Sequence, residues 1–193
     1  MSGNIILSKI TGEYIPVKIK SRTNDAMQLW SKIWPKETEY EIYDGRINIG
    51  HVYIADTNYG CYVQRIENKK PYEYGRFGYL ADKTEVQYCL EKGMDTFEIR
   101  SQGALNSHAL HYLRGKQFEG IATTDQIRTF QYMFPWAKLD SFDYNTIIKF
   151  IIDNTPKGEK FNTEFLGQIP MFMPQKVIQK YIKELIKNPI IIK

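Results

Sequence analysis

The sequence predicts a mixed α/β fold in which helices flank a mainly antiparallel sheet, with a helical extension at the C-terminus. Three observations predict this fold. Asp44-Gly45 lies between two extended runs and is a strong hairpin signal, so an antiparallel meander is expected around it. A glycine-containing loop then leads into a helix, a strand and a second helix over residues 74–118. Beyond Pro135 the apolar spacing becomes mainly helical.

The composition indicates a folded chain with a sizeable core. Apolar residues make up 42% and aromatic residues 14% of the 193 residues. The net charge of +4 is too weak to indicate a nucleic-acid partner, but it is compatible with an anionic small ligand. Cys61 and Cys89 have no metal-like spacing and are expected to be free thiols. Without a signal-peptide pattern or a membrane-length apolar run, we expect a cytoplasmic protein with no membrane partner.

A strand and then a helix are expected near the N-terminus. Residues 14–20 alternate between apolar and polar side chains, which is typical of a half-buried strand. Cap-forming residues follow at 21–24, and the apolar residues after Ala26 have helical spacing. Pro35 would end this helix, because proline cannot continue it.

The meander is expected to have three strands, over residues 40–43, 47–55 and 61–66. In the second strand the apolar residues change from odd-numbered to even-numbered positions near Gly50. An extra residue in one strand of a pair produces such a change, so a β-bulge is predicted there.

The helix after the glycine loop has two alternative starts. Gly78 favours an early entry at Phe77, whereas Asp82 with Glu85 resembles a capping box and favours a later one. Gly93 is the natural residue to follow the helix, because glycine accepts the left-handed conformation common there.

A strand over residues 96–100 and a helix capped by Asn106 or Ser107 are expected next. Residues 118–123 and 127–133 would then form a hairpin, although the second of these segments is also compatible with a helix.

The C-terminal part is expected to be a separate extension. Residues 144–152 and 176–187 both have helical spacing, and the second is strongly amphipathic. We therefore expect an N-terminal domain over residues 1–134 and a mainly helical extension over residues 135–193 that packs on it.

The order of these elements resembles the GCN5-related N-acetyltransferase (GNAT) superfamily over about residues 14–133. The stretches that carry the resemblance are the strand-to-helix junction at 21–26, the hairpin at 43–52, a loop at 73–80 similar to the acyl-CoA pyrophosphate loop, the helix-to-strand run at 90–99, and Asn106-x-x-Ala109 followed by Phe118. Two departures stand out. Gly75 and Gly78 are separated by two residues, and the position of the family's tyrosine in the second helix is occupied by Leu113, with Tyr112 one residue earlier.

The resemblance implies a GNAT-like fold that uses acetyl-CoA as co-substrate and no metal. Acetyl-CoA would lie between strands 61–66 and 96–100, and an amine would attack it directly in a ternary complex. Glu67 would be the base and Tyr112 the acid. The expected acetyl-CoA-binding residues are Ile66, Tyr74, Gly75, Arg76, Phe77, Gly78, Tyr79, Asn106 and Ala109. The loop also has a physical rationale, because free amides at a helix start bind anions.

The acceptor would be a small-molecule or protein amine, and the sequence does not exclude a homodimer. A second hypothesis is that the chain is a catalytically inactive GNAT-fold binding module whose residues 135–193 form a partner surface. The departures in the loop and at Tyr112 favour this second hypothesis, whereas the intact order of elements and Asn106 favour the enzyme.

Overall fold

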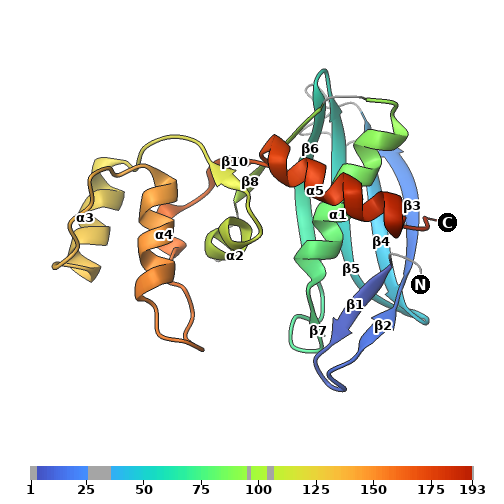
Figure 1. Ribbon diagram of the computed structural model, residues 1–193, viewed down its shortest axis with the longest axis horizontal. Helices are drawn as coiled ribbons and strands as arrows, with labels where there is room; N and C mark the ends of the chain where they lie inside the picture. Colours follow the sequence, from blue (N-terminus) through green and yellow to red (C-terminus); the bar gives the residue numbers. More distant parts are fainter. Residues whose placement is uncertain (1–3, 26–35, 95–96, 104–106, 193) are drawn as a thin grey trace. The chain divides into compact units, whose positions relative to one another are not determined.

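The computed structural model describes residues 4–25, 36–94, 97–103 and 107–192 (Figure 1). Within it the chain forms two compact units. The first comprises Met1–Ile99 and Gln175–Lys193, and the second comprises Arg100–Pro174. The boundary expected at residue 135 therefore falls inside the second unit. The helix predicted over residues 26–34 lies outside the described residues.

The first unit contains seven strands and two helices within its described residues. They are β1 Ile5–Ser8, β2 Tyr14–Pro16, β3 Lys18–Asp25, β4 Lys36–Asp44, β5 Ile47–Thr57, β6 Gly60–Asn68, β7 Tyr74–Gly75, α1 Phe77–Glu91 and α5 Gln175–Lys187. Two antiparallel arrays form, in the orders β2-β1-β7 and β3-β4-β5-β6. The predicted mixed α/β class and the antiparallel meander are confirmed.

Two bulges interrupt the meander. Between β4 and β5, Ile42 pairs with Gly50 but Tyr43 pairs with Asn48, which leaves Ile49 as the extra residue. This confirms the bulge predicted near Gly50. A second bulge in β6 makes Gln64 the extra residue, since the register with β5 shifts between Tyr53 and Ile54.

The meander has one apolar and one polar face, as the alternation of side chains along a strand requires. Helices α1 and α5 lie across one face of β3–β6 in Figure 1. The buried side chains that form this core include Ile19, Ile42, Val52, Ile54, Leu80, Val86, Ile178 and Leu185. Cys61 and Cys89 are buried and free, in agreement with the sequence analysis.

The expected cap at residues 21–24 is wrong. These residues belong to β3, which continues to Asp25 and pairs with β4 along its whole length. Backbone hydrogen bonds across the ladder satisfy the same donors and acceptors that a helix start would have used, so the local preference for a cap is overridden.

Helix α1 starts early, at Phe77, so the alternative start at Asp82 is wrong. Asp82 and Glu85 are fully buried inside the helix. The end agrees with the prediction, because Gly93 has φ +72° and its amide donates to the Leu90 carbonyl.

The second unit contains the rest of β8 Glu98–Gly103, with α2 His108–Leu113, β9 Gln117–Phe118, α3 Thr124–Met133, α4 Tyr144–Asn154, the 3-10 helix η1 Glu164–Leu166 and β10 Ile169–Phe172. Strands pair antiparallel in the order β8-β10-β9. The hydrophobic core of this unit centres on Phe130, Ile147 and Ile148. Among the described residues, no helix combines the length and the apolar character that crossing a membrane requires.

The hairpin expected over residues 118–133 is wrong, and the helical alternative for residues 127–133 is confirmed by α3, whose N-terminus has a capping box between Thr123 and Gln126. Helix α4 is confirmed and is capped by the Asp143 carboxylate, which accepts from the Thr146 amide. In the first unit, α5 is confirmed with the expected buried stripe.

Candidate functional site

The start of α1 offers free backbone donors. Arg76, the N-cap residue, has φ 59° and ψ 16°, which is the left-handed conformation. Its carbonyl accepts from the amides of Tyr79 and Leu80. Among the described residues, the amides of Phe77 and Gly78 have no acceptor. Two free amides at the positive end of a helix dipole form a site for an anion.

The Arg76 side chain is exposed beside this helix start. Its guanidinium carbon lies 5.3 Å from the centroid of the Tyr14 ring. A non-glycine residue in the left-handed conformation carries strain, and such strain is often retained where backbone or side chain is needed for a ligand. The guanidinium adds a positive charge to the two free amides.

Tyr74 and Gly75 form β7 and fix the position of the helix start. Gly75 pairs with Leu7 of β1. Tyr74 is buried, and its hydroxyl donates to Oδ2 of Asp44 at 2.8 Å. Burial and this hydrogen bond raise the pKa of Tyr74 to about 12, so the phenol stays neutral. The two residues anchor the loop, and Arg76 and the following amides are the groups left for a ligand.

Phe77 and Tyr79 pack into the first unit. Phe77 is buried, and its ring lies so close to Gly50 that a Cβ there would be 2.4 Å from the Phe77 Cζ atom. The hydroxyl of Tyr79 donates to Glu184 of α5. Burial and that hydrogen bond raise the pKa of Tyr79.

Ile66 and Glu67 lie near the end of β6. Ile66 pairs with Val52, and Glu67 pairs with His51 of β5. The Glu67 side chain is 34% exposed, and its Oε2 atom lies 3.2 Å from Nη2 of Arg65. The base expected from the sequence is therefore a partly solvated carboxylate next to a histidine.

His51, Glu39 and Tyr53 form a hydrogen-bonded cluster on the polar face of the meander. Nδ1 of His51 lies 2.5 Å from Oε1 of Glu39, and the Tyr53 hydroxyl donates to the same oxygen at 2.9 Å. His51 and Glu39 are each only 7% exposed. Burial opposes ionisation of Glu39, but the hydrogen bonds from Tyr53 and His51 outweigh it and hold the pKa of Glu39 below its ordinary value. No motif or spacing in the sequence indicated this cluster.

Glu41 adds a second carboxylate beside His51. The two residues are directly opposite in the β4–β5 ladder, and Nδ2 of Asn48 donates to Glu41 at 3.4 Å. One ligand atom each from Glu39, Glu41 and His51 lie within 4.8 Å of one another. Two carboxylates and an imidazole suit a divalent cation, and they equally suit proton transfer from a bound amine.

Gln64, the bulge residue of β6, carries an unsatisfied donor. Its Nε2 atom is buried and has no hydrogen-bond partner among the described residues. Leaving a buried donor unpaired costs about 1–3 kcal/mol, so the position favours an acceptor such as a carbonyl oxygen.

The remaining expected residues belong to the second unit or are not described. Ala109 and Tyr112 lie on α2 in the second unit, where Ala109 is buried and Tyr112 packs against the core. Asn106 lies outside the described residues. His111 on the same helix is buried, and its Nδ1 atom lies 2.7 Å from Nη2 of Arg114.

Comparison with known proteins gives likenesses in structure. No family model matches the chain, and no curated protein sequence is similar to it. An acetyltransferase from Bacillus subtilis in complex with CoA is 12% identical with a TM-score of 0.39, and the match covers 81% of this chain and 98% of that chain.

Two further structures are similar to the same extent. A GNAT family acetyltransferase from Elizabethkingia anophelis with acetyl-CoA bound is 12% identical, with a TM-score of 0.44 over 81% of this chain and 97% of that chain. An acyl-CoA N-acyltransferase from Pseudomonas aeruginosa is 7% identical, with a TM-score of 0.44 over 81% of this chain and 100% of that chain. GNAT is also the superfamily that the sequence motifs resemble.

Proposed function

We propose that the protein is an acyl-CoA-dependent N-acetyltransferase, which moves an acetyl group from acetyl-CoA to an amine by direct attack in a ternary complex. The observation that carries the proposal is the start of α1. There the amides of Phe77 and Gly78 have no acceptor among the described residues, and the exposed side chain of Arg76 leaves the chain at the same turn. It follows an antiparallel meander, in the order that the sequence resemblance leads one to expect for an acyl-CoA pyrophosphate loop.

The diphosphate of acetyl-CoA fits this site chemically. Its oxygens would accept from the two amides, and Arg76 would add a charge-assisted hydrogen bond. Tyr74 and Gly75 would hold the loop through β7, while Phe77 and Tyr79 would hold the helix to the rest of the unit. Ile66, Asn106 and Ala109 remain proposed contacts for the rest of acetyl-CoA.

Acyl transfer to an amine needs few catalytic groups. The amine must lose a proton, the tetrahedral oxyanion needs a donor, and the departing thiolate must take a proton. Glu67 and His51 share one row of the ladder and are both candidates for the amine's proton. Tyr112 remains the proposed acid. The buried Nε2 of Gln64 is a candidate donor to the oxyanion.

The alternative function, an inactive binding module with a C-terminal partner surface, has less support. The apolar stripe of α5 is buried within the first unit, through Val177, Ile178, Tyr181 and Leu185. That stripe is therefore not available to a partner. We propose a cytoplasmic enzyme, because two buried free cysteines suit a reducing compartment.

The test is turnover. The full chain is incubated with acetyl-CoA and a mixture of small amines, free CoA thiol is titrated over time, and acetylated amines are identified by mass spectrometry. The proposal predicts thiol release that depends on both enzyme and amine, with one acetylated product per thiol. Thiol release that is independent of amine, with no acetylated product, would contradict it.

A further inference from the structure

We propose that the acceptor is an amine that also carries an anionic group, and that it binds on the polar face of the β3–β6 meander. Its anion would lie in a cavity lined by cationic side chains, and its amine would lie at His51. This assignment rests on the N-acetyltransferase function proposed above, and it adds an acceptor class to it.

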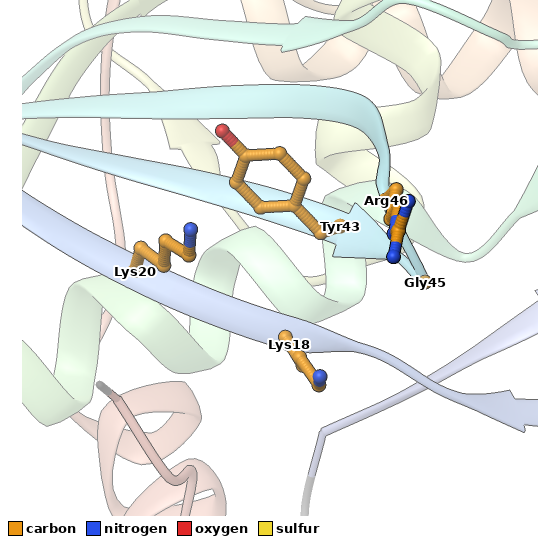
Figure 2. Close-up of a pocket in the computed structure, with 5 residues that line it drawn as sticks. All are labelled: Lys18, Lys20, Tyr43, Gly45 and Arg46. Atoms are coloured by element: carbon orange, nitrogen blue, oxygen red, sulfur yellow. The ribbon is translucent and has the colours of Figure 1, made fainter.

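The cavity lies where β3 passes the β4–β5 hairpin. It has a volume of about 250 Å³ and is lined by Lys18, Lys20, Tyr43, Gly45 and Arg46, as Figure 2 shows. The Lys20 ammonium lies 5.0 Å from the centroid of the Tyr43 ring. Within the described residues, Lys18, Lys20 and Arg46 have no carboxylate partner. Three cations around one cavity repel one another, and a bound anion would relieve this repulsion.

The strand register connects this cavity to the buried histidine. Lys20 is opposite Glu41, Glu41 is opposite His51, and Lys18 is opposite Tyr43 two rows further along, on the same face. Neighbouring strands are about 4.8 Å apart, so the backbones of Lys20 and His51 are separated by roughly 10 Å. The Lys20 ammonium lies over the Tyr43 ring of β4, the strand between β3 and β5. A small molecule with an amine at one end and an anion at the other would span the distance from this ammonium to His51.

His51 is oriented to take a proton from the acceptor. In the tautomer that donates Nδ1–H to the Glu39 carboxylate, the imidazole has its lone pair on Nε2. This is the arrangement by which a carboxylate orients a histidine base. The Tyr53 hydroxyl donates to the same carboxylate and helps to keep it in place.

The proposed step forms one C–N bond, breaks one C–S bond and moves two protons. The acceptor ammonium gives one proton to Nε2 of His51, and the freed nitrogen lone pair forms a C–N bond to the acetyl carbonyl carbon. The C–S bond then breaks, the CoA sulfur leaves as a thiolate, and it receives the second nitrogen proton by way of Tyr112, the proposed acid. The products are the N-acetylated amine and CoA thiol, and His51 returns its proton to solvent.

The anion site is tested with two acceptor pairs that differ only in charge. They are O-phosphoethanolamine with ethanolamine, and β-alanine with β-alaninamide. In at least one of the two pairs, we expect kcat/KM to be about tenfold or more higher for the anionic member than for the neutral member. An added charge-assisted contact would give a difference of this size. In the double variant Lys18→Gln, Lys20→Gln this preference should fall to near unity. The control Lys176→Gln, an exposed lysine at the start of α5, should retain it.

The base is tested by pH profiles. His51→Gln and Glu39→Gln should each lower kcat by about 10²-fold or more and remove the acidic limb of the kcat/KM profile for the acceptor. The charged and titratable groups around His51 are Glu39, Glu41, Tyr53, Glu67, Arg65, Arg22 and Lys20. The single variants Glu41→Gln and Glu67→Gln are therefore measured together with His51→Gln and Glu39→Gln. An acidic limb that persists in His51→Gln would overturn the assignment of the base.

The outcomes separate this inference from the proposed function. Acetylation of the neutral and anionic members at equal kcat/KM would overturn the acceptor class while leaving the acetyltransferase intact. Activity lost on treatment with EDTA and restored by Zn²⁺ would show that Glu39, Glu41 and His51 hold a metal, and would also overturn the role of His51. Failure of the wild type to bind acetyl-CoA in calorimetry would instead contradict the proposed function.

Discussion

His51 and Glu67 are directly opposite each other in the β5–β6 ladder, so the base expected from the sequence and the histidine found in the structure share one row. Their environments differ. His51 is 7% exposed and bonded to Glu39, whereas the Glu67 side chain is 34% exposed and paired with Arg65. His51 is held in place by a buried carboxylate, whereas Glu67 contacts only a largely exposed arginine, so His51 is the better oriented of the two.

The first prediction therefore ranks the two residues. Glu67→Gln should lower kcat by about tenfold or less, and His51→Gln by about 10²-fold or more. Steady-state kinetics with saturating acetyl-CoA measures both. If Glu67→Gln has the larger effect, the partly exposed carboxylate is the base and the ranking is wrong.

The second prediction concerns Arg76. Arg76→Asn removes the guanidinium but keeps a residue that tolerates the left-handed conformation. We expect CoA binding to weaken by about 10- to 100-fold, since a charge-assisted hydrogen bond contributes about 1.5–3 kcal/mol. The matched control is Arg128→Asn, an exposed arginine on α3. Equal CoA affinity in both variants would place the diphosphate elsewhere.

The third prediction compares two glycines of the first unit. A Cβ on Gly50 would lie 2.2 Å from the Glu67 carbonyl oxygen and 2.4 Å from Cζ of Phe77. Gly50→Ala should therefore destabilise the protein by about 3 kcal/mol or more. A Cβ on Gly75 would meet only side-chain atoms of Leu7 and Lys9, at 3.3 and 3.4 Å.

Gly75→Ala should accordingly stay within about 1 kcal/mol of the wild type. Urea unfolding followed by far-UV circular dichroism measures both variants. Similar stabilities for the two would mean that Phe77 does not pack over Gly50 as described.

The sequence predicted the strands of the meander in the first unit, but not the His51–Glu39 cluster. The β4–β5 bulge explains why the cluster was missed. From the Asp44-Gly45 turn, a regular hairpin would place Tyr40 opposite His51. The extra residue Ile49 shifts the register by one, so Glu41 lies opposite His51 instead. A shift of one residue moves side chains to the other face. The bulge was predicted near Gly50, but its size and position are set by packing, including Phe77 against Gly50.

Other differences have a similar origin. Residues 21–24 prefer a cap locally, yet pairing with β4 makes them strand. The capping box at Thr123 and Gln126 was visible in the sequence and would have favoured α3 over a hairpin. Gly93, by contrast, was predicted correctly because its conformation depends only on its own residue type.

The fourth prediction concerns α5. Tyr181 is 1% exposed, and its hydroxyl donates at 3.1 Å to Oδ2 of Asp82, which is fully buried. Tyr181→Phe should cost about 1–3 kcal/mol, because it takes a donor from a buried carboxylate. Tyr79→Phe removes a donor from Glu184, whose side chain is 29% exposed, and should cost less. Urea unfolding compares the two, and the reverse order would contradict the burial of Asp82 under α5.

The fifth prediction concerns pH and the second unit. Burial lowers the pKa of His108, and burial together with Lys116 and Arg114 lowers that of His111 well below its ordinary value. Below about pH 6.5 the unfolded chain therefore binds more protons than the folded one, so stability falls as pH decreases. Each histidine contributes up to about 1.4 kcal/mol per pH unit in this window.

His111→Gln should reduce that loss. Urea unfolding at about pH 7.5 and about pH 5 should show a larger drop for the wild type than for the variant, because glutamine does not titrate. An equal drop in both would mean that His111 is protonated in the folded protein.

The most direct test of the central claim is calorimetric titration of the wild-type protein with acetyl-CoA. We expect one saturable site per chain, with a dissociation constant below millimolar. No binding at millimolar acetyl-CoA, with the protein shown to be folded by circular dichroism, would contradict the assignment of the α1 start as an acyl-CoA site.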